Sequence, residues 1–234
     1  MTRAVEVCQA ATACAVLVLS LLAGCAMLLP PATPQPTYYG LEAAAPEGSA
    51  VARVPAGTGA PLLTLEVERP TAAASYDTNR IVYLRSHFEP EYFAYSRWVD
   101  TPARMLSPLL ISAVAASGAF GAVISAPNAA TSDLWLGTEI LLLQQVFGGR
   151  QSSVQFILRA NFVDSATRRV LVSRELSATV ASASEDPHGG VVAANAAVRA
   201  VLDELVGLCG EAIAARNGAV PHNAARTATH PAAR

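Results

Sequence analysis

Apolar and polar residues alternate along the second half of the chain, a pattern typical of strands with one buried face. The alternation is clearest over Val154–Phe162 and returns over Val170–Val180. A preceding apolar segment, Leu134–Phe147, has the length of a long strand, whose regularity we expect to break at Gly137. Together the three segments predict an antiparallel meander with one solvent-exposed face.

Turn residues separate these strands. Gly148-Gly149 predicts a tight turn after the first strand. Asp164–Thr167 turns the chain before the last strand. Asp186-Pro187-His188-Gly189 ends the alternation, and a loop of this composition is more typical of a helix cap than of a catalytic site.

Two segments follow the helical period instead. Thr101-Pro102 supplies an N-cap and a first-turn proline, and Gly118 supplies a C-terminal stop, so a helix is predicted between them. Pro108 implies a bent first turn or a later start. A longer helix is predicted from about Val191 to Arg216. Its apolar stripe comprises Val191, Ala194, Val198, Val201, Leu202, Leu205, Leu208 and Ile213.

Shorter strands are predicted earlier in the chain. They cover Leu62–Val67, Asn79–Arg85, Glu91–Trp98 and Phe120–Ser125, and Tyr38–Leu41 can add a first strand. Four of the aromatic residues in this region stand out as a candidate cluster: Tyr83, Tyr92, Tyr95 and Trp98. They form either a lipid-contacting cluster or part of the core, and their density favours the core.

The predicted elements follow in the order strands, a helix, four strands and a closing helix. This order indicates an α+β fold. We expect a two-layer sandwich in which a mixed, mostly antiparallel sheet carries two helices on one face. The folded domain is expected over residues 61–216, followed by a disordered tail over 217–234 that is rich in alanine and polar residues.

The N-terminus has the pattern of a secretory signal over residues 1–24. Arg3 precedes an apolar stretch from about Ala10 to Leu22. The stretch closes on Leu22-Ala23-Gly24-Cys25, which resembles the bacterial lipobox. In this interpretation a signal peptidase recognises Leu22, Ala23 and Gly24, and Cys25 carries the lipid. The alternatives are an uncleaved anchor or an ordinary signal peptide with a chance cysteine.

A lipidated Cys25 changes the expected organisation of the chain. Several acyl chains on one cysteine make a membrane anchor effectively permanent. Residues 25–60 then form a Pro/Ala/Gly-rich tether between lipid and domain. Cys8 and Cys14 leave with the signal, so Cys209 is the one remaining thiol, predicted to be buried and inert. Residue 26 is Ala rather than the Asp that retains lipoproteins at the inner membrane, which indicates the outer membrane.

Composition and charge exclude some classes of protein. The 234 residues carry 16 arginines, no lysine and 18 acidic residues, and the formal net charge is -2. This balance argues against a nucleic-acid partner. Beyond the N-terminus no apolar run reaches the length of a membrane-spanning helix, so a polytopic membrane protein is also excluded.

Motifs of catalysis are missing from the sequence. It has no nucleophile elbow, P-loop, dinucleotide fingerprint or zinc-protease motif. The histidines His87, His188, His222 and His230 are too scattered for a metal site. Glu139 is expected on the exposed face of its strand, or paired with an arginine if it points inward. We therefore expect no enzyme activity, no cofactor and no metal.

The lipobox at Cys25, the strand Ile81-Val82-Tyr83, Tyr92 and the run from Trp98 to Pro102 into a helix together resemble one family. It is the ABC-type transport auxiliary lipoprotein family, which includes the paraquat-inducible lipoprotein C. The resemblance covers roughly residues 38–213. It implies a non-enzymatic accessory that holds the outer-membrane end of a tunnel of MCE-domain proteins. That tunnel works with an ABC permease and ATPase that move lipids between the membranes.

Two other functions stay open at this point. One is an assembly lipoprotein for an outer-membrane barrel. The other is a periplasmic lipid hydrolase, for which Asp186 and His188 are the nearest candidates. A homo-oligomeric ring is compatible with a cyclic tunnel partner. Edge strands of the domain could accept an extended segment of a partner.

Overall fold

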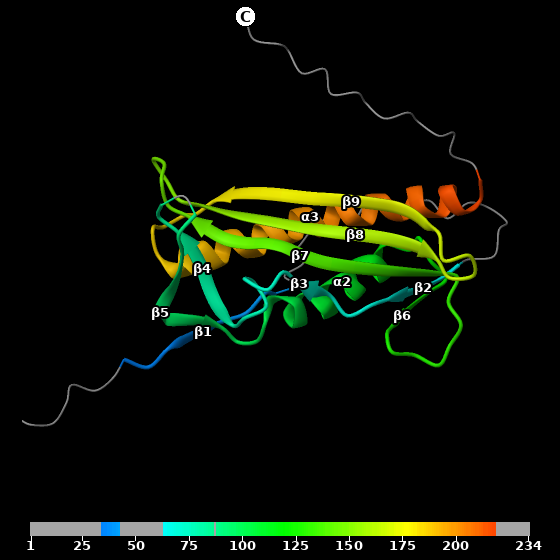
Figure 1. The fold of residues 1–234 in the computed structure, drawn as a ribbon, viewed down its shortest axis with the longest axis horizontal. Helices are drawn as coiled ribbons and strands as arrows, with labels where there is room; N and C mark the ends of the chain where they lie inside the picture. The colour runs from blue at the N-terminus through cyan, green and yellow to red at the C-terminus, as the bar shows by residue number, and fades with distance from the viewer. Residues whose placement is uncertain (1–33, 43–62, 87, 219–234) are drawn as a thin grey trace, which may run out of the picture. The chain divides into compact units, whose positions relative to one another are not determined.

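The computed structural model describes residues 34–42, 63–86 and 88–218, and those from Pro36 onward belong to one compact unit. In this part of the chain nine strands form one open mixed sheet, and two helices cover one of its faces (Figure 1). The predicted α+β two-layer fold is confirmed. None of the helices among these residues is long and apolar enough to span a bilayer.

The predicted meander forms one side of the sheet. Strands β7 (Leu134–Val146), β8 (Ser153–Asp164) and β9 (Val170–Ala181) pair antiparallel in chain order. The alternating apolar residues of β8, among them Phe156 and Phe162, are fully buried beneath the helices. The period-2 pattern therefore identified both the strands and their buried face.

Two predicted details of the meander are wrong. The register shift of β7 lies between Ile140 and Leu142, whereas Gly137 pairs in register with Asn161. The run of leucines there has no alternation that could reveal an extra residue. Gly137 serves close packing instead, because a Cβ at this position would meet the Trp135 ring at 3.0 Å.

Gly148-Gly149 does not form a tight turn. Val146 pairs with Ser153, so a longer loop joins β7 to β8. This loop is fixed by hydrogen bonds to the segment after β9 rather than by strand pairing between β7 and β8. The Ser152 N–H donates to the Glu185 carboxylate at 2.7 Å, and Ser182 N–H donates to the Ser152 carbonyl at 2.8 Å.

The other edge of β7 is shared by three short strands. β2 (Thr64–Val67), β3 (Thr71–Ala72) and β4 (Arg80–Leu84) pair parallel with successive parts of β7. The remaining strands extend the sheet: β5 (Pro90–Trp98) is antiparallel to β4, β1 (Thr37–Tyr39) is parallel to β5, and β6 (Ala122–Ser125) is parallel to β2. Most of the paired residues nevertheless belong to antiparallel pairs, as the sequence predicted.

Helix α2 (Pro102–Ser117) begins at the predicted proline, so the later start considered for Pro108 is wrong. Pro108 lies inside the helix on its exposed side. Thr101 acts as N-cap through its backbone, since its carbonyl accepts from the N–H of Arg104 at 3.0 Å. Gly118 ends the helix in the left-handed conformation, with φ of 67°.

Helix α3 (Pro187–Arg216) covers β8 and β9 and also contacts α2. It begins four residues before the predicted Val191, because Asp186 caps it. The Gly189 N–H donates to the Asp186 carboxylate at 2.7 Å, and Pro187 occupies the first turn. The predicted stripe is buried apart from half-buried Ile213, and Cys209 is fully buried.

The start of α3 leaves no room for a side chain at Gly189. A Cβ there would collide with the backbone of Ser184, and backbone atoms can shift only at a cost in stability. Gly207, in the same helix, is exposed and has open space around its Cα.

We predict opposite effects for alanine at these two glycines. Gly189→Ala should lower the free energy of unfolding by about 1–3 kcal/mol through overpacking. Gly207→Ala should raise it by about 0.5–1 kcal/mol, because alanine is the better helix former. Urea unfolding of both variants measures the difference. Equal effects would show that Gly189 is not constrained by Ser184.

Candidate anchoring and docking surfaces

The predicted anchoring residues Leu22, Ala23, Gly24 and Cys25 lie outside the described residues. The structure does describe where the chain that follows Cys25 joins the domain. β1 pairs with the end of β5, with Tyr38 opposite Arg97 and Tyr39 opposite Trp98. The optional first strand of the sequence prediction is therefore present.

Side-chain bonds fix this junction to the start of α3. Asn195 accepts from the backbone N–H of Glu42 at 2.7 Å and donates to the Gly40 carbonyl at 3.3 Å. The Tyr39 ring lies 6.3 Å from the His188 ring, centroid to centroid. Sequence reasoning missed Asn195, since a single polar residue within a helical stripe gives no sign of a partner more than 150 residues away.

The four aromatic residues of the predicted cluster differ in burial, and Tyr92 is half-buried. Trp98 is part of the buried core, and buried Tyr83 packs on Phe93 with 4.4 Å between ring centroids. The Tyr83 hydroxyl donates to Glu91 at 2.7 Å, and this bond is the main cause that raises the pKa of Tyr83. The preference for the core is wrong for Tyr95, which is 52% exposed.

The sheet offers one long open edge. Among the described strands, β9 pairs with β8 and with no strand on its other side. Such an edge can accept an extended segment of another protein, as expected from the sequence. On the exposed face beside it, Arg159 binds Glu139 at 2.9 Å and Glu175 at 2.8 Å, which confirms the exposed position of Glu139.

Of the two hydrolase candidates, Asp186 is the N-cap of α3 and the His188 ring lies near Tyr39. Ser184 donates its hydroxyl proton directly to Asp186 at 2.9 Å, so no imidazole stands between the hydroxyl and the carboxylate. A catalytic triad requires that imidazole to accept the serine proton. The Gly189 N–H, followed by the Ser184 hydroxyl, lowers the pKa of Asp186. This geometry serves the start of α3 rather than nucleophilic catalysis.

No cluster of potential metal ligands occurs among residues 34–42, 63–86 and 88–218. His87, His222 and His230 lie outside these ranges. Burial raises the pKa of the Cys209 thiol to about 12, so this cysteine stays protonated and unreactive, as predicted.

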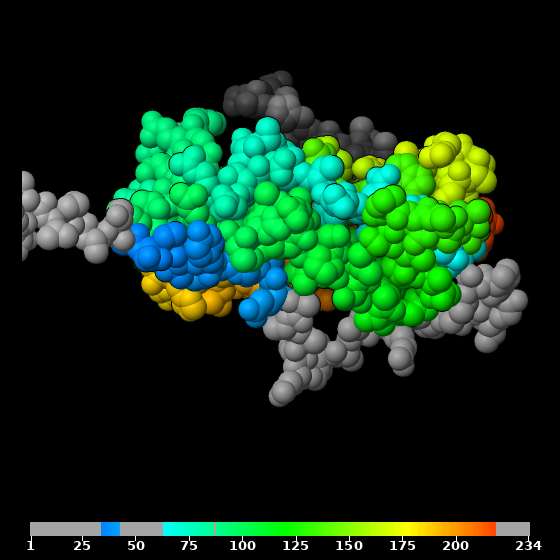
Figure 2. All heavy atoms as spheres, turned by 90° about the horizontal axis from the view of Figure 1, so that it is seen from below, coloured from blue at the N-terminus to red at the C-terminus, as the bar shows by residue number. Residues whose placement is uncertain are grey.

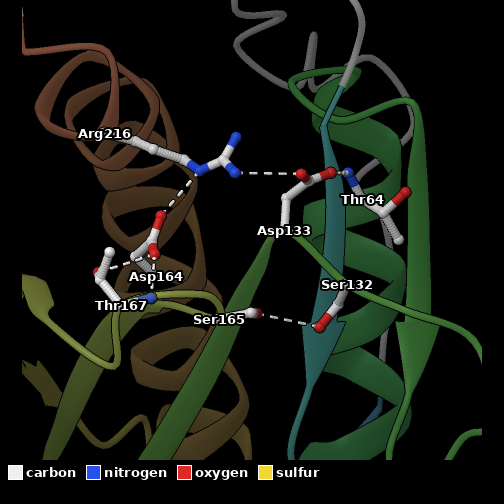
Figure 3. A network of polar contacts seen from close by, with 7 residues as sticks. All are labelled: Thr64, Ser132, Asp133, Asp164, Ser165, Thr167 and Arg216. Atoms are coloured by element: carbon white, nitrogen blue, oxygen red, sulfur yellow. Dashed lines mark hydrogen bonds and ion pairs between the residues drawn. The ribbon is translucent and has the colours of Figure 1, made fainter.

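An ionic network that the sequence did not reveal lies at the C-terminal end of α3, opposite to the Asp186 cap (Figure 3). Arg216, at the end of α3, donates to Asp164 at 2.9 Å and to Asp133 at 3.1 Å. Asp133 in turn accepts from the Thr64 N–H at 2.9 Å. The helix end is thereby tied to β2, β7 and β8. A basic residue in the last helical turn was the only sequence signal.

Asp164 is held by several donors at once. The backbone N–H and the hydroxyl of Thr167 donate to it at 2.7 and 2.8 Å. Together with Arg216 they lower the pKa of Asp164 to about 2, with the Thr167 N–H as the largest cause.

Comparison with family models gives a match over most of the folded domain. The family model of the ABC-type transport auxiliary lipoprotein component matches residues 39–206, which is more than half of the chain. The chain belongs to this family. As a member, it is an auxiliary lipoprotein of ABC-type transport, which associates it with an ABC transport system and with the cell envelope.

Solved structures support the fold of this auxiliary lipoprotein. A DUF330 protein from Xanthomonas campestris is 24% identical, with a TM-score of 0.61, over 75% of this chain and 97% of that one. A protein described as uncharacterized is 15% identical, with a TM-score of 0.50, over 79% and 97% of the two chains. The search of curated protein sequences gave no match.

The Asp164 network predicts a specific acid dependence of stability. Because the pKa of Asp164 is lowered from 3.8 to about 2, its stabilising contribution is complete above pH 3.8 and is lost as the pH falls toward 2. Asp164→Asn should lower the melting temperature at neutral pH, and the difference from the wild type should shrink over that acid window. Thermal unfolding at several pH values measures this.

A surface ion pair provides the control for that experiment. Arg174 lies 3.9 Å from Glu211, and both side chains are exposed. Arg174→Ala should leave the melting temperature nearly unchanged at any pH, because exposed pairs contribute little. An Asp164→Asn effect that is independent of pH would contradict the ionic role of this carboxylate.

The cap geometry predicts different results for the two hydrolase candidates. Asp186→Ala should lower the melting temperature, whereas Asp186→Asn should retain most of it, because asparagine is also a good N-cap. His188→Ala should leave transport-dependent growth intact in cells that carry the complete system. Loss of that growth in a stably folded His188→Ala protein would reopen the hydrolase hypothesis.

Proposed function

We propose that this protein is lipidated at Cys25 and anchored to the periplasmic face of the outer membrane. Cleavage after Gly24 would remove residues 1–24, and the new N-terminal cysteine would carry the acyl chains. The Leu22-Ala23-Gly24-Cys25 pattern and the lipoprotein family support this anchor, and Ala26 favours the outer membrane.

We further propose that the folded domain docks the tunnel formed by an MCE-domain protein. The permease and ATPase of the same ABC system would be indirect partners at the inner membrane. The observation that carries the proposal is the family match over residues 39–206. The open edge of β9 offers a surface for such a partner, and a homo-oligomeric ring would match a cyclic tunnel.

The proposed organisation follows from this role. Residues 1–24 are the signal peptide, residues 25–60 lead from the lipid toward the domain, 61–216 form most of the domain and 217–234 a tail. We propose a structural accessory rather than an enzyme, because the Ser184–Asp186 pair caps α3 and the Cys209 thiol is buried. Neither a cofactor nor a metal enters this proposal.

Affinity purification from gently solubilised cells tests the partner. The tagged protein should bring along an MCE-domain protein together with its permease and ATPase, identified by mass spectrometry. Recovery of a barrel protein alone, or of no envelope protein, would reject the transport role. Cells from which the MCE gene has been deleted provide the control, since the permease and ATPase should then be lost as well.

Substitution of the lipid attachment residue tests the anchor. Cys25→Ser should abolish acylation, and the protein should move from the membrane fraction unless the uncleaved signal holds it. Cys209→Ser is the matched control, because this buried thiol should carry no lipid. Mass spectrometry of the N-terminal peptide distinguishes lipidation from retention of the signal. An acyl group on another residue would contradict the proposal.

A further inference from the structure

We propose that the outer face of β1 and β5 lies against the headgroup region of the membrane that holds Cys25. We call this surface the β1–β5 face and define it by Tyr38, Tyr95, Val99, Arg97 and Arg80. The inference rests on the proposed lipidation and extends it, since it assigns an orientation to the anchored domain.

Three large apolar side chains are exposed on this face. Tyr38 is 58% exposed, Tyr95 52% and Val99 63%. They share one side of the sheet, because Tyr38 is registered with Arg97 and Tyr95 is two residues before Arg97 in β5. Val99 directly follows β5, two residues after Arg97, and its N–H donates to the Tyr39 carbonyl at 2.8 Å. The intervening residues Tyr39 and Trp98 face the core instead. Figure 2 shows β1 (blue) at the molecular surface beside the mint-green residues of the β5 region.

Arginines accompany the aromatic side chains. Arg97 is exposed and is registered with exposed Arg80, whose guanidinium lies 3.9 Å from the centre of the Tyr92 ring. The acidic residue next to Val99, Asp100, is paired with Arg104 at 3.2 Å. Tyrosine favours the boundary between headgroups and acyl chains, and arginine binds anionic headgroups. The face therefore has the chemistry of an interfacial contact.

The path of the chain places this face near the bilayer. Twelve residues lead from Cys25 to Thr37, the first residue of β1. They span at most about 40 Å when fully extended, and about 20 Å as a flexible chain. β1 is thus the first element of the domain that the lipid anchor can bring to the membrane.

The other end of the domain lies much farther from the anchor. β1 contacts the N-terminal end of α3, and this helix of 30 residues is about 45 Å long. Val170 belongs to the far end, since it pairs with Val163 beside Asp164, which binds Arg216. Val170 is itself 55% exposed, so exposure alone does not distinguish the two ends.

Fluorescence quenching by brominated lipids tests the orientation. Two variants of the full-length gene, Tyr38→Trp and Val170→Trp, are purified from the envelope as lipoproteins and reconstituted into vesicles of phosphatidylethanolamine and phosphatidylglycerol. Wild-type emission from Trp98 and Trp135 is subtracted. Brominated acyl chains should reduce emission at position 38 by about half or more, because an interfacial indole lies close to them. Emission at position 170 should stay unchanged.

The outcomes separate the two proposals. If the lipoproteins do not float with vesicles in a density gradient, the anchor fails, and the orientation that depends on it fails too. If they float but the two positions are quenched equally, or neither is quenched, the anchor stands and the β1–β5 face does not contact lipid. That second result would leave the face to a protein partner and would overturn this inference.

Discussion

Backbone pairing along β7 is the interaction on which the rest of the structure depends. One edge of this strand is filled by β8, and the other is filled in succession by β2, β3 and β4. Segments from the first half of the chain are thereby held against the meander of the second half. Loss of β7 would leave these short strands without the hydrogen-bonded partner that fixes their positions.

Helix α3 converts this sheet into a two-layer domain. Its apolar stripe covers β8 and β9, and each of its ends is fixed separately. At the N-terminus Asp186 caps the first turn, and Gly189 allows the helix to approach Ser184 closely. At the C-terminus Arg216 binds Asp133 and Asp164, which belong to the opposite end of the sheet. The helix thus sets the length of the domain.

Three side chains considered for chemistry have structural surroundings. The polar groups that sequence reasoning considered for chemistry are used for structure: Asp186 in a cap, Glu139 in an ion pair and Cys209 in the core. Among the described residues, the open edge of β9 and the face of β1 and β5 are exposed. These are the two surfaces to which the proposals above assign a partner and a membrane.

Local patterns in the sequence determined the meander, both helices, the start of α2 at Pro102, its C-cap at Gly118 and the buried stripe of α3. Each of these depends on the types and the spacing of neighbouring residues. Local patterns also indicated the lipobox at Cys25. Tertiary structure alone decided the parallel pairing of β2, β3 and β4 with β7, the bonds of Asn195 to Gly40 and Glu42, the Arg216 network and the exposure of Tyr95. These join residues far apart in the sequence, and periodicity within one segment carries no information about its distant partners.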